Sequence, residues 1–301
     1  MEQLWGIDLG GTKVEGVVLD AETYEVISRT RIPTEKEHGY EHIISQIHKL
    51  VELLKEQTAS TPGKIGIGTP GAIDPTTQTL KNSNTVCLNY QPLKRDLESM
   101  LGLPVEMAND ANCFALAEAR MGIVPDIYPH AQVVFGVIMG TGVGGGIVID
   151  KKIINGKQGI AGEWGHSFLD DSGGKCYCGD IGCVERIISG PALERYYREI
   201  SGKQARLPEI VQAYREQNDT HAAQTMERLL HFFGKGLSNV INILDPDVVV
   251  LGGGVGNIEE LYQEGIERLK DHIFNTRFET IVAKPKLGDS AGVFGAAFLG
   301  A

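Results

Sequence analysis

Short apolar runs separated by glycine-rich turns open the chain. Residues 3–8 (QLWGID) predict a strand that enters the turn LGGTK, and residues 14–20 and 25–33 predict two further strands of an antiparallel meander. Apolar side chains at helical spacing then predict a helix over residues 39–58. Residues 64–71 predict a buried strand that ends in a Pro-Gly turn.

The first half closes with a predicted strand at residues 104–110 and a helix that starts at Asp110. The second half of the chain then repeats much of this succession of predicted elements. Residues 131–157 predict strand, glycine turn, strand and short strand, and residues 245–269 predict strand, glycine turn and helix. A long helical stretch at about residues 190–244 lies between them.

Two glycine turns that follow strands, DLGGTK at 8–13 and MGTGVGGG at 139–146, look like one motif used twice. We therefore expect an α/β fold of two similar halves. We assign residues 1–122 to the first domain and residues 123–290 to the second. The last helix, 291–301, is expected to return to the first domain, because chain ends often lie close together.

The composition disfavours several classes of protein. Among 301 residues, 28 Lys and Arg stand against 39 Asp and Glu, a net charge of −11 without a basic tract, which disfavours a nucleic-acid-binding surface. No apolar run reaches the length of a membrane span, and the N-terminus lacks the pattern of a signal peptide, so we expect a cytoplasmic protein. Five cysteines in such a chain do not indicate a disulfide framework, and the isolated Cys87 and Cys113 are expected to be buried free thiols.

Three glycine-rich turns, each after an apolar strand, indicate phosphate binding, because glycine lets backbone N–H groups approach an anion. Thr12 adds a hydroxyl donor and Lys13 a positive charge. Any one such turn alone is equally well explained as an ordinary connection between strands. The motif GxxxxGK[ST] is absent, and the first turn leads into a strand rather than a helix, which argues against a P-loop and a Rossmann fingerprint. The candidate nucleotide-binding residues are Asp8, Gly10, Gly11, Thr12, Lys13, Gly140, Thr141, Gly142, Gly252, Gly253 and Gly254.

The segment EWGHSFLDDSGGKCYCGDIGCVE at 163–185 contains a metal-binding pattern, H-x9-C-x-C-x4-C. Three thiolates and one imidazole form a closed tetrahedral set for Zn²⁺, and a closed set leaves no position for a reactive water, so this zinc is expected to be structural. A chance group of free thiols is the alternative, and a disulfide is disfavoured in a cytosolic chain. Zinc would fix a turn-rich loop flanked by Glu163 and Glu185. The expected ligands are His166, Cys176, Cys178 and Cys183.

Seven motifs are spread over nearly the whole chain. They are GIDLGGTK at 6–13, GIGTPG at 66–71, NDANCFALAEA at 109–119, GTGVGGGIV at 140–148, GEWGH at 162–166, CYCGDIGCVE at 176–185 and LDPDVVVLGGG at 244–254. Together they make the chain resemble the ROK family (repressors, open reading frames and sugar kinases) within the actin, hexokinase and Hsp70 superfamily.

The resemblance implies two ribonuclease-H-like domains of the actin-like ATPase type that flank a nucleotide and sugar cleft. It implies an ATP-dependent sugar kinase with Mg²⁺ near Asp8 and with Asp110 as the general base that accepts the proton of a sugar hydroxyl. Residues 109 and 110 also fit a helix N-cap, a role that Asn and Asp both fill. His166 would bind zinc through one ring nitrogen and the sugar through the other. The implied sugar-binding residues are Gly71, Asn84, Asn109, Asp110, Glu163, His166 and Glu185.

The identity of the sugar stays open at this point. The segment LKNSNTVCLNYQPL at 80–93 and the Trp of GEWGH favour the fructokinase and mannokinase branch, so we expect the 6-hydroxyl of fructose or mannose, then of glucose. An N-acetylglucosamine or N-acetylmannosamine kinase of the same family is the alternative. A non-catalytic sugar-sensing regulator is disfavoured, because the five residues before Gly6 leave no room for a helix-turn-helix domain. We expect a homodimer, as family members often form.

Overall fold

The computed structural model describes residues 2–301, except for the side chain of Asp289. The chain forms two compact units. Unit 1 runs to Ile127 and also contains Gly146–Ala161 and Lys286–Ala301, whereas unit 2 contains Tyr128–Gly145 and Gly162–Pro285. Within the described residues, no helix is long and apolar enough to cross a membrane.

Unit 1 is built on a five-stranded sheet. Its strands are β1 (Gln3–Leu9), β2 (Lys13–Asp20), β3 (Val26–Pro33), β4 (Ile65–Thr69) and β7 (Val105–Asn109). The sheet has the order β3-β2-β1-β4-β7. β1, β2 and β3 form the antiparallel meander expected from the sequence, and β4 and β7 continue the sheet parallel to β1.

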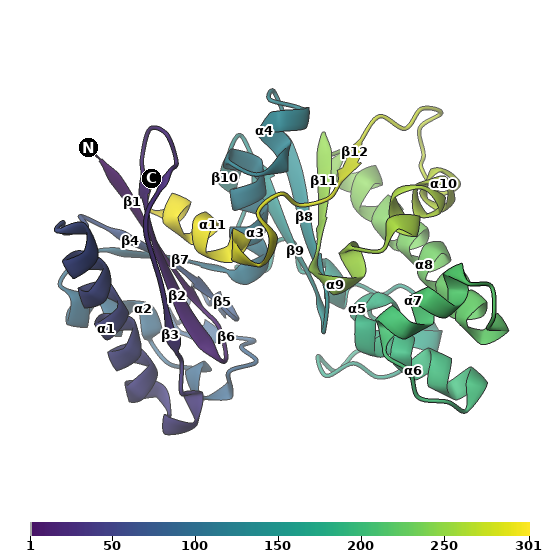
Figure 1. Ribbon diagram of the computed structural model, residues 1–301, viewed down its shortest axis with the longest axis horizontal. Helices are drawn as coiled ribbons and strands as arrows, with labels where there is room; N and C mark the ends of the chain where they lie inside the picture. Colours follow the sequence, from purple (N-terminus) through teal and green to yellow (C-terminus); the bar gives the residue numbers. More distant parts are fainter. Residues whose placement is uncertain (1) are drawn as a thin grey trace. The chain divides into compact units, whose positions relative to one another are not determined.

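Helices cover both faces of this sheet. α1 (Tyr40–Thr58) and α2 (Leu93–Leu101) lie on one face, and α3 (Asp110–Arg120) and α11 (Ala291–Leu299) lie on the other (Figure 1). The apolar side chains that predicted α1 are each at most 2 % exposed and pack against the sheet; they are Ile43, Ile44, Ile47, Leu50, Val51 and Leu54. α11 lies directly on β4, because a Cβ on Gly66 would be 1.8 Å from the carbonyl oxygen of Ala296.

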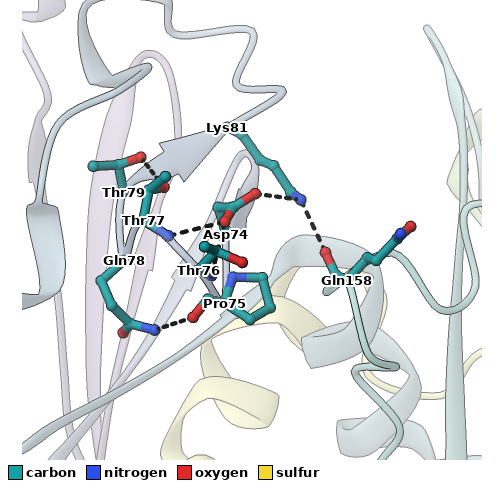
Figure 2. Close-up of polar contacts among 8 residues, drawn as sticks. All are labelled: Asp74, Pro75, Thr76, Thr77, Gln78, Thr79, Lys81 and Gln158. Atoms are coloured by element: carbon teal, nitrogen blue, oxygen red, sulfur yellow. Dashed lines mark hydrogen bonds and ion pairs between the residues drawn. The ribbon is translucent and has the colours of Figure 1, made fainter.

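A small hairpin of β5 (Ala72–Ile73) and β6 (Leu80–Lys81) also belongs to unit 1. Figure 2 shows the Lys81 ammonium donating to the Asp74 carboxylate at 3.0 Å and to the carbonyl of Gln158 at 2.9 Å. The backbone N–H of Thr77, followed by Lys81, lowers the pKa of Asp74 to about 2. The hairpin therefore holds the segment around Gln158 against unit 1.

Unit 2 carries most of the second five-stranded sheet. Its strands are β8 (Val133–Met139), β9 (Val143–Ile149), β10 (Lys152–Ile153), β11 (Val248–Gly252) and β12 (Ile281–Ala283). The order is β10-β9-β8-β11-β12, with β11 parallel to both β8 and β12. Three strands consecutive in sequence are followed by two parallel strands, as in the first sheet. The repeated motif expected from the two glycine turns is thus a repeat of topology.

The helical stretch predicted at about 190–244 consists of three helices, α6 (Gly190–Ser201), α7 (Leu207–Arg215) and α8 (Thr220–Leu244). They and α10 (Glu264–Lys270) lie in unit 2 (Figure 1). The remaining short elements are η1 (Lys36–His38), η2 (Val86–Leu88), α4 (Ile123–Ile127), η3 (Trp164–His166), η4 (Asp171–Gly173), α5 (Glu185–Ile188), α9 (Gly253–Gly256), η5 (Glu259–Tyr262) and η6 (Gly288–Ser290).

The two units differ from the sequence-based domains mainly at Gly146–Ala161, which the sequence placed in the second domain. This segment packs on α3, because a Cβ on Gly146 would lie 2.5 Å from the carbonyl oxygen of Ala111. The Arg120 guanidinium also donates to the carbonyl of Lys151 at 3.1 Å. The unit boundary therefore falls inside β9, a position that no linker composition marks.

Candidate active site and metal centre

Unit 1 brings Asp8 and Asp110 together at the carboxyl ends of its parallel strands. Asp8 pairs with Gly68 of β4, and Asp110 directly follows β7. Burial, and next the Asp110 carboxylate, raise the pKa of Asp8 from 3.8 to about 6. Burial among protein atoms also raises the pKa of Asp110, and the residue as a whole keeps surface that solvent can reach. The charged forms of these two neighbouring carboxylates are disfavoured, so a cation bound beside them would stabilise both charges.

Asn109 and Asp110 divide the roles at the start of α3. Asn109 is the N-cap, since its Oδ1 accepts a 2.8 Å hydrogen bond from the backbone N–H of Asn112. Asp110 is the first helical residue, and its Oδ1 accepts a 2.8 Å bond from the N–H of Ala111. The capping role that the sequence allowed for either residue therefore belongs to Asn109.

Gly71 and Asn84 reach the same edge of the sheet. Thr69 pairs with Asn109 at the ends of β4 and β7, and its hydroxyl donates to the carbonyl of Gly71 at 2.8 Å. A Cβ on Gly71 would lie 3.0 Å from the backbone nitrogen of Ser83. The exposed Asn84 follows directly. Unit 1 thus gathers all four of its predicted sugar-binding residues at one sheet edge.

The first glycine turn, between β1 and β2, is closed by a 3.0 Å bond from the Gly10 N–H to the Lys13 carbonyl. Thr34 fixes this turn, because its hydroxyl donates to the Gly10 carbonyl at 2.7 Å and its N–H to the Thr12 carbonyl at 3.0 Å. The side chain of Thr12 is exposed. The Lys13 ammonium lies 3.9 Å from Glu15, so this predicted phosphate cation is shared with a buried carboxylate.

Two glycine turns lie side by side in unit 2. Gly140–Gly142 connects β8 to β9 and includes the exposed Thr141, and Gly252–Gly254 spans the end of β11 and the start of α9. A Cβ on Gly253, whose φ is +81°, would lie 2.3 Å from the carbonyl oxygen of Met139. Both the left-handed backbone and the close approach require glycine here. Such turns at the ends of adjacent parallel strands can present backbone N–H groups to an anion.

The four predicted metal ligands also come together in unit 2, with all ligand atoms within 4.8 Å of one another. Cys178 Sγ is 3.6 Å from Cys183 Sγ, and Cys176 Sγ is 3.7 Å from His166 Nδ1. A tetrahedral site with Zn–S of about 2.3 Å and Zn–N of about 2.0 Å separates two sulfurs by about 3.8 Å, and a sulfur and a nitrogen by about 3.5 Å. The donors therefore fit Zn²⁺ in type and spacing.

No disulfide joins any of the five cysteines in the structure. Cys178 and Cys183 are not bonded in the structure, because their sulfurs are 3.6 Å apart, well beyond an S–S bond of about 2.0 Å. Outside the cluster, Cys113 is buried as expected, whereas Cys87, which was also expected to be buried, is only half-buried. Burial raises the pKa of Cys113, with smaller contributions from Asp8 and Asp110, so this thiol stays protonated.

Tyr177 connects the metal cluster to the glutamates that flank it. Its hydroxyl lies 2.9 Å from His166 Nε2, and the two rings meet edge to face at 5.1 Å. Desolvation, followed by the charges of Glu185, Cys176 and Glu163 in that order, raises the pKa of Tyr177 to about 12. The second His166 nitrogen, which the sequence assigned to the sugar, is thus paired with Tyr177. Sequence reasoning did not single out Tyr177, although its place between Cys176 and Cys178 was a signal.

Trp164, the aromatic residue of GEWGH, points into the core of unit 2. It is 6 % exposed, and its indole N–H donates to the carbonyl of Gly236 in α8 at 3.2 Å. Its ring meets Phe135 edge to face at 6.2 Å. This tryptophan favoured the fructokinase and mannokinase branch, but a core position carries little information about the sugar.

Comparisons with known proteins agree over the full length. The ROK family profile matches residues 4–301. The chain is 36% identical to N-acetyl-D-glucosamine kinase of Aliivibrio fischeri, with 98% of each chain covered. It also resembles the ROK hexokinase of Thermus thermophilus, with a TM-score of 0.88, 31% identity and coverage of 99% of this chain and 97% of that one. A ROK family glucokinase of Streptomyces griseus, solved with glucose and AMPPNP, gives a TM-score of 0.77, 30% identity and 99% coverage of both chains. The expected fold class, two ribonuclease-H-like domains of the actin-like ATPase type, is confirmed by these neighbours.

Proposed function

The chain belongs to the ROK family and is an ATP-dependent sugar kinase, and we propose that it transfers the γ-phosphoryl group of ATP to the 6-hydroxyl of a free hexose. The main observation behind this proposal is that Asn109, and not Asp110, serves as the helix cap. Asn109 caps α3, which leaves the Asp110 carboxylate, whose pKa is raised by burial, free of the capping role at the carboxyl edge of the sheet. A carboxylate in this state is suited to accept the proton of a sugar hydroxyl.

Each glycine turn is proposed as a phosphate-binding element of its own unit, with Gly10 and Gly11 in unit 1 and Gly140–Gly142 and Gly252–Gly254 in unit 2. Asp8 is assigned to Mg²⁺, because its carboxylate is crowded by Asp110 and Mg²⁺ prefers hard oxygen ligands. Bound Mg²⁺ would neutralise charge on the β- and γ-phosphates. The chain itself then positions the phosphates and takes up the proton at Asp110.

Zinc at the Cys/His cluster is assigned a structural role. The donor spacing matches a zinc tetrahedron, and four protein ligands leave no open position. The surrounding loop is rich in turns and glycine and has few apolar side chains, so it depends on the metal for its shape.

For the sugar, we place N-acetylglucosamine and glucose ahead of fructose and mannose. The curated relative at 36% identity is an N-acetyl-D-glucosamine kinase, and the solved relatives at 31% and 30% identity are a hexokinase and a glucokinase. The expected preference for fructose or mannose loses part of its basis, because Trp164 is buried in the core of unit 2.

A coupled assay of ADP release with Mg²⁺-ATP and a panel of N-acetylglucosamine, N-acetylmannosamine, glucose, mannose and fructose tests the proposal. We expect N-acetylglucosamine or glucose to give the highest kcat/KM. ADP release no higher with any sugar than without one would contradict the assignment of a hexose substrate. The Asp110→Asn variant is the control for contaminating kinases.

A further inference from the structure

The ammonium group of Lys36 lies at the first glycine turn, although Lys36 is far from that turn in sequence. A Cβ on Gly11 would be 3.5 Å from Lys36 Nζ and also 3.5 Å from the hydroxyl of Thr85. Gly11 is the residue whose backbone the proposed function assigns to a phosphate of ATP. A positive charge and a hydroxyl donor therefore flank the same point of the turn.

Several interactions hold the backbone before Lys36 in place. Thr34 is fully buried and bonds to the turn on both sides, as described above. Glu35 has a left-handed backbone with φ of 51°, which is unfavourable for a residue with a Cβ. Its carboxylate is held by His42 Nε2 at 2.7 Å and by the side-chain amide of Gln46 at 3.1 Å. These contacts compensate for the unusual backbone and direct the following residue toward Gly11.

Lys36 replaces the cation that the sequence assigned to Lys13. The ammonium of Lys13 is 3.9 Å from Glu15, a buried carboxylate that also pairs with Arg29 and Arg31 on β3. Among the described residues, no carboxylate forms an ion pair with Lys36. Its exposed ammonium is therefore available to a ligand at the turn.

The neighbours of Lys36 indicate which part of the ligand it meets. The ammonium lies beside the glycine turn assigned to phosphate and near Thr85, which follows the predicted sugar residue Asn84. The group that lies between a nucleotide phosphate and a sugar hydroxyl is the phosphoryl group in transfer. Catalysis of this reaction consists mainly of positioning and of stabilising charge on that group. We infer that Lys36 binds the transferred γ-phosphoryl group, an inference that rests on the proposed function of the turn.

The test compares Lys36→Met, which keeps the length of the side chain but removes its charge, with the parent. Lys55→Met on α1 is the matched control, because Lys55 pairs with Glu52 and lies on the helix that carries His42 and Gln46. We expect Lys36→Met to lower kcat by about 10- to 1,000-fold, with the KM for sugar changed less than about 3-fold. Lys36→Arg should restore part of the activity, because the charge returns.

A binding measurement separates this role from a structural one. In calorimetric titrations without sugar, Lys36→Met should lower the affinity for AMPPNP by about 10-fold. The affinity for ADP should fall by less than about 2-fold, because ADP lacks the γ-phosphoryl group. Equal weakening of both nucleotides, or a kcat within about 3-fold of the parent, would overturn the inference. If the parent itself phosphorylates none of the sugars, the proposed function fails, and the AMPPNP-to-ADP ratio still tests Lys36 by itself.

Discussion

The Glu185 carboxylate accepts a 3.0 Å hydrogen bond from the backbone N–H of Val143. This bond joins the end of the Cys/His segment to the glycine turn between β8 and β9. A second contact lies beside it, because a Cβ on Gly165 would be only 1.8 Å from the carbonyl oxygen of Val143. The metal-binding segment and the turn assigned to ATP phosphate are therefore one packed structure within unit 2, although the sequence separates them.

Glu185 should consequently affect nucleotide binding as well as the sugar. We expect Glu185→Ala to lower the affinity for AMPPNP by about 3- to 10-fold in the absence of sugar, since the net contribution of a hydrogen bond is about 0.5–1.5 kcal/mol. Glu185→Gln keeps an oxygen acceptor for Val143, so its AMPPNP affinity should equal that of the parent or exceed it. Calorimetric titration decides the matter, and an Ala variant that binds AMPPNP as the parent does would show that the turn is held without Glu185.

Removal of the metal should act on both ligands for the same reason. We expect elemental analysis to find one Zn²⁺ per chain in the parent and in Cys87→Ser, and much less in Cys178→Ser. In Cys178→Ser, sugar affinity should fall by more than about 10-fold and AMPPNP affinity by about 3- to 10-fold, the worth of the bond to Val143.

Cys87→Ser is the matched control, because Cys87 lies in unit 1 and outside the cluster. A parent protein without zinc would contradict the metal assignment. A Cys178→Ser variant with full AMPPNP affinity would instead contradict the link between the two segments.

Asp110→Asn tests the general base. The amide preserves the shape of the side chain but accepts no proton at neutral pH, so kcat should fall by about 100- to 10,000-fold. Because Asn109 supplies the helix cap, the midpoint of thermal unfolding should not fall, and it should rise at neutral pH because burial disfavours the Asp110 charge that the amide removes. Asn109→Ala is the complementary variant, and it should lower stability by about 1 kcal/mol. If Asp110→Asn kept more than half of the parent kcat, the base would have to be another group.

The sequence predicts the elements of this fold well because their signals are local. Apolar runs and glycine turns identify the strands, and three cysteines within eight residues, with one upstream histidine, identify the metal cluster. The duplicated sheet order follows from the repeated glycine motif. Each of these signals lies within one short segment of chain.

The features that the sequence did not predict depend on contacts between segments that are distant along the chain. Lys36 reaches Gly11 only because Thr34 and Glu35 hold the intervening backbone, and no spacing rule connects positions 11 and 36. The assignment of Gly146–Ala161 to unit 1 depends on its packing against α3, and the core position of Trp164 depends on α8. Long-range packing of this kind leaves no periodic trace in the sequence.

Asp8 gives a prediction about pH and stability. Its pKa is about 6 in the folded chain, against an ordinary value of 3.8, with burial as the first cause and Asp110 as the second. Between these two pH values the folded state keeps a proton that the unfolded state has lost, so Asp8 makes the protein less stable as the pH rises through this window. Above about pH 6 the full penalty remains. Asp8→Asn should therefore raise the free energy of unfolding at pH 7 by about 1–3 kcal/mol, and the gain should vanish below about pH 4.

Thermal unfolding of Asp8→Asn and the parent from pH 4 to 8, in buffer without Mg²⁺, measures this difference. Asp20→Asn is the control of opposite sign, because the backbone N–H groups of Thr23 and Glu22 lower the pKa of Asp20, and its loss should not stabilise the protein at pH 7. Asp8→Asn should at the same time lose kinase activity, because the amide replaces the carboxylate assigned to Mg²⁺. A variant that is less stable than the parent at pH 7 would mean that the Asp8 charge is already compensated within unit 1. In that case the raised pKa of Asp8 would no longer support the assignment of Mg²⁺ to this carboxylate.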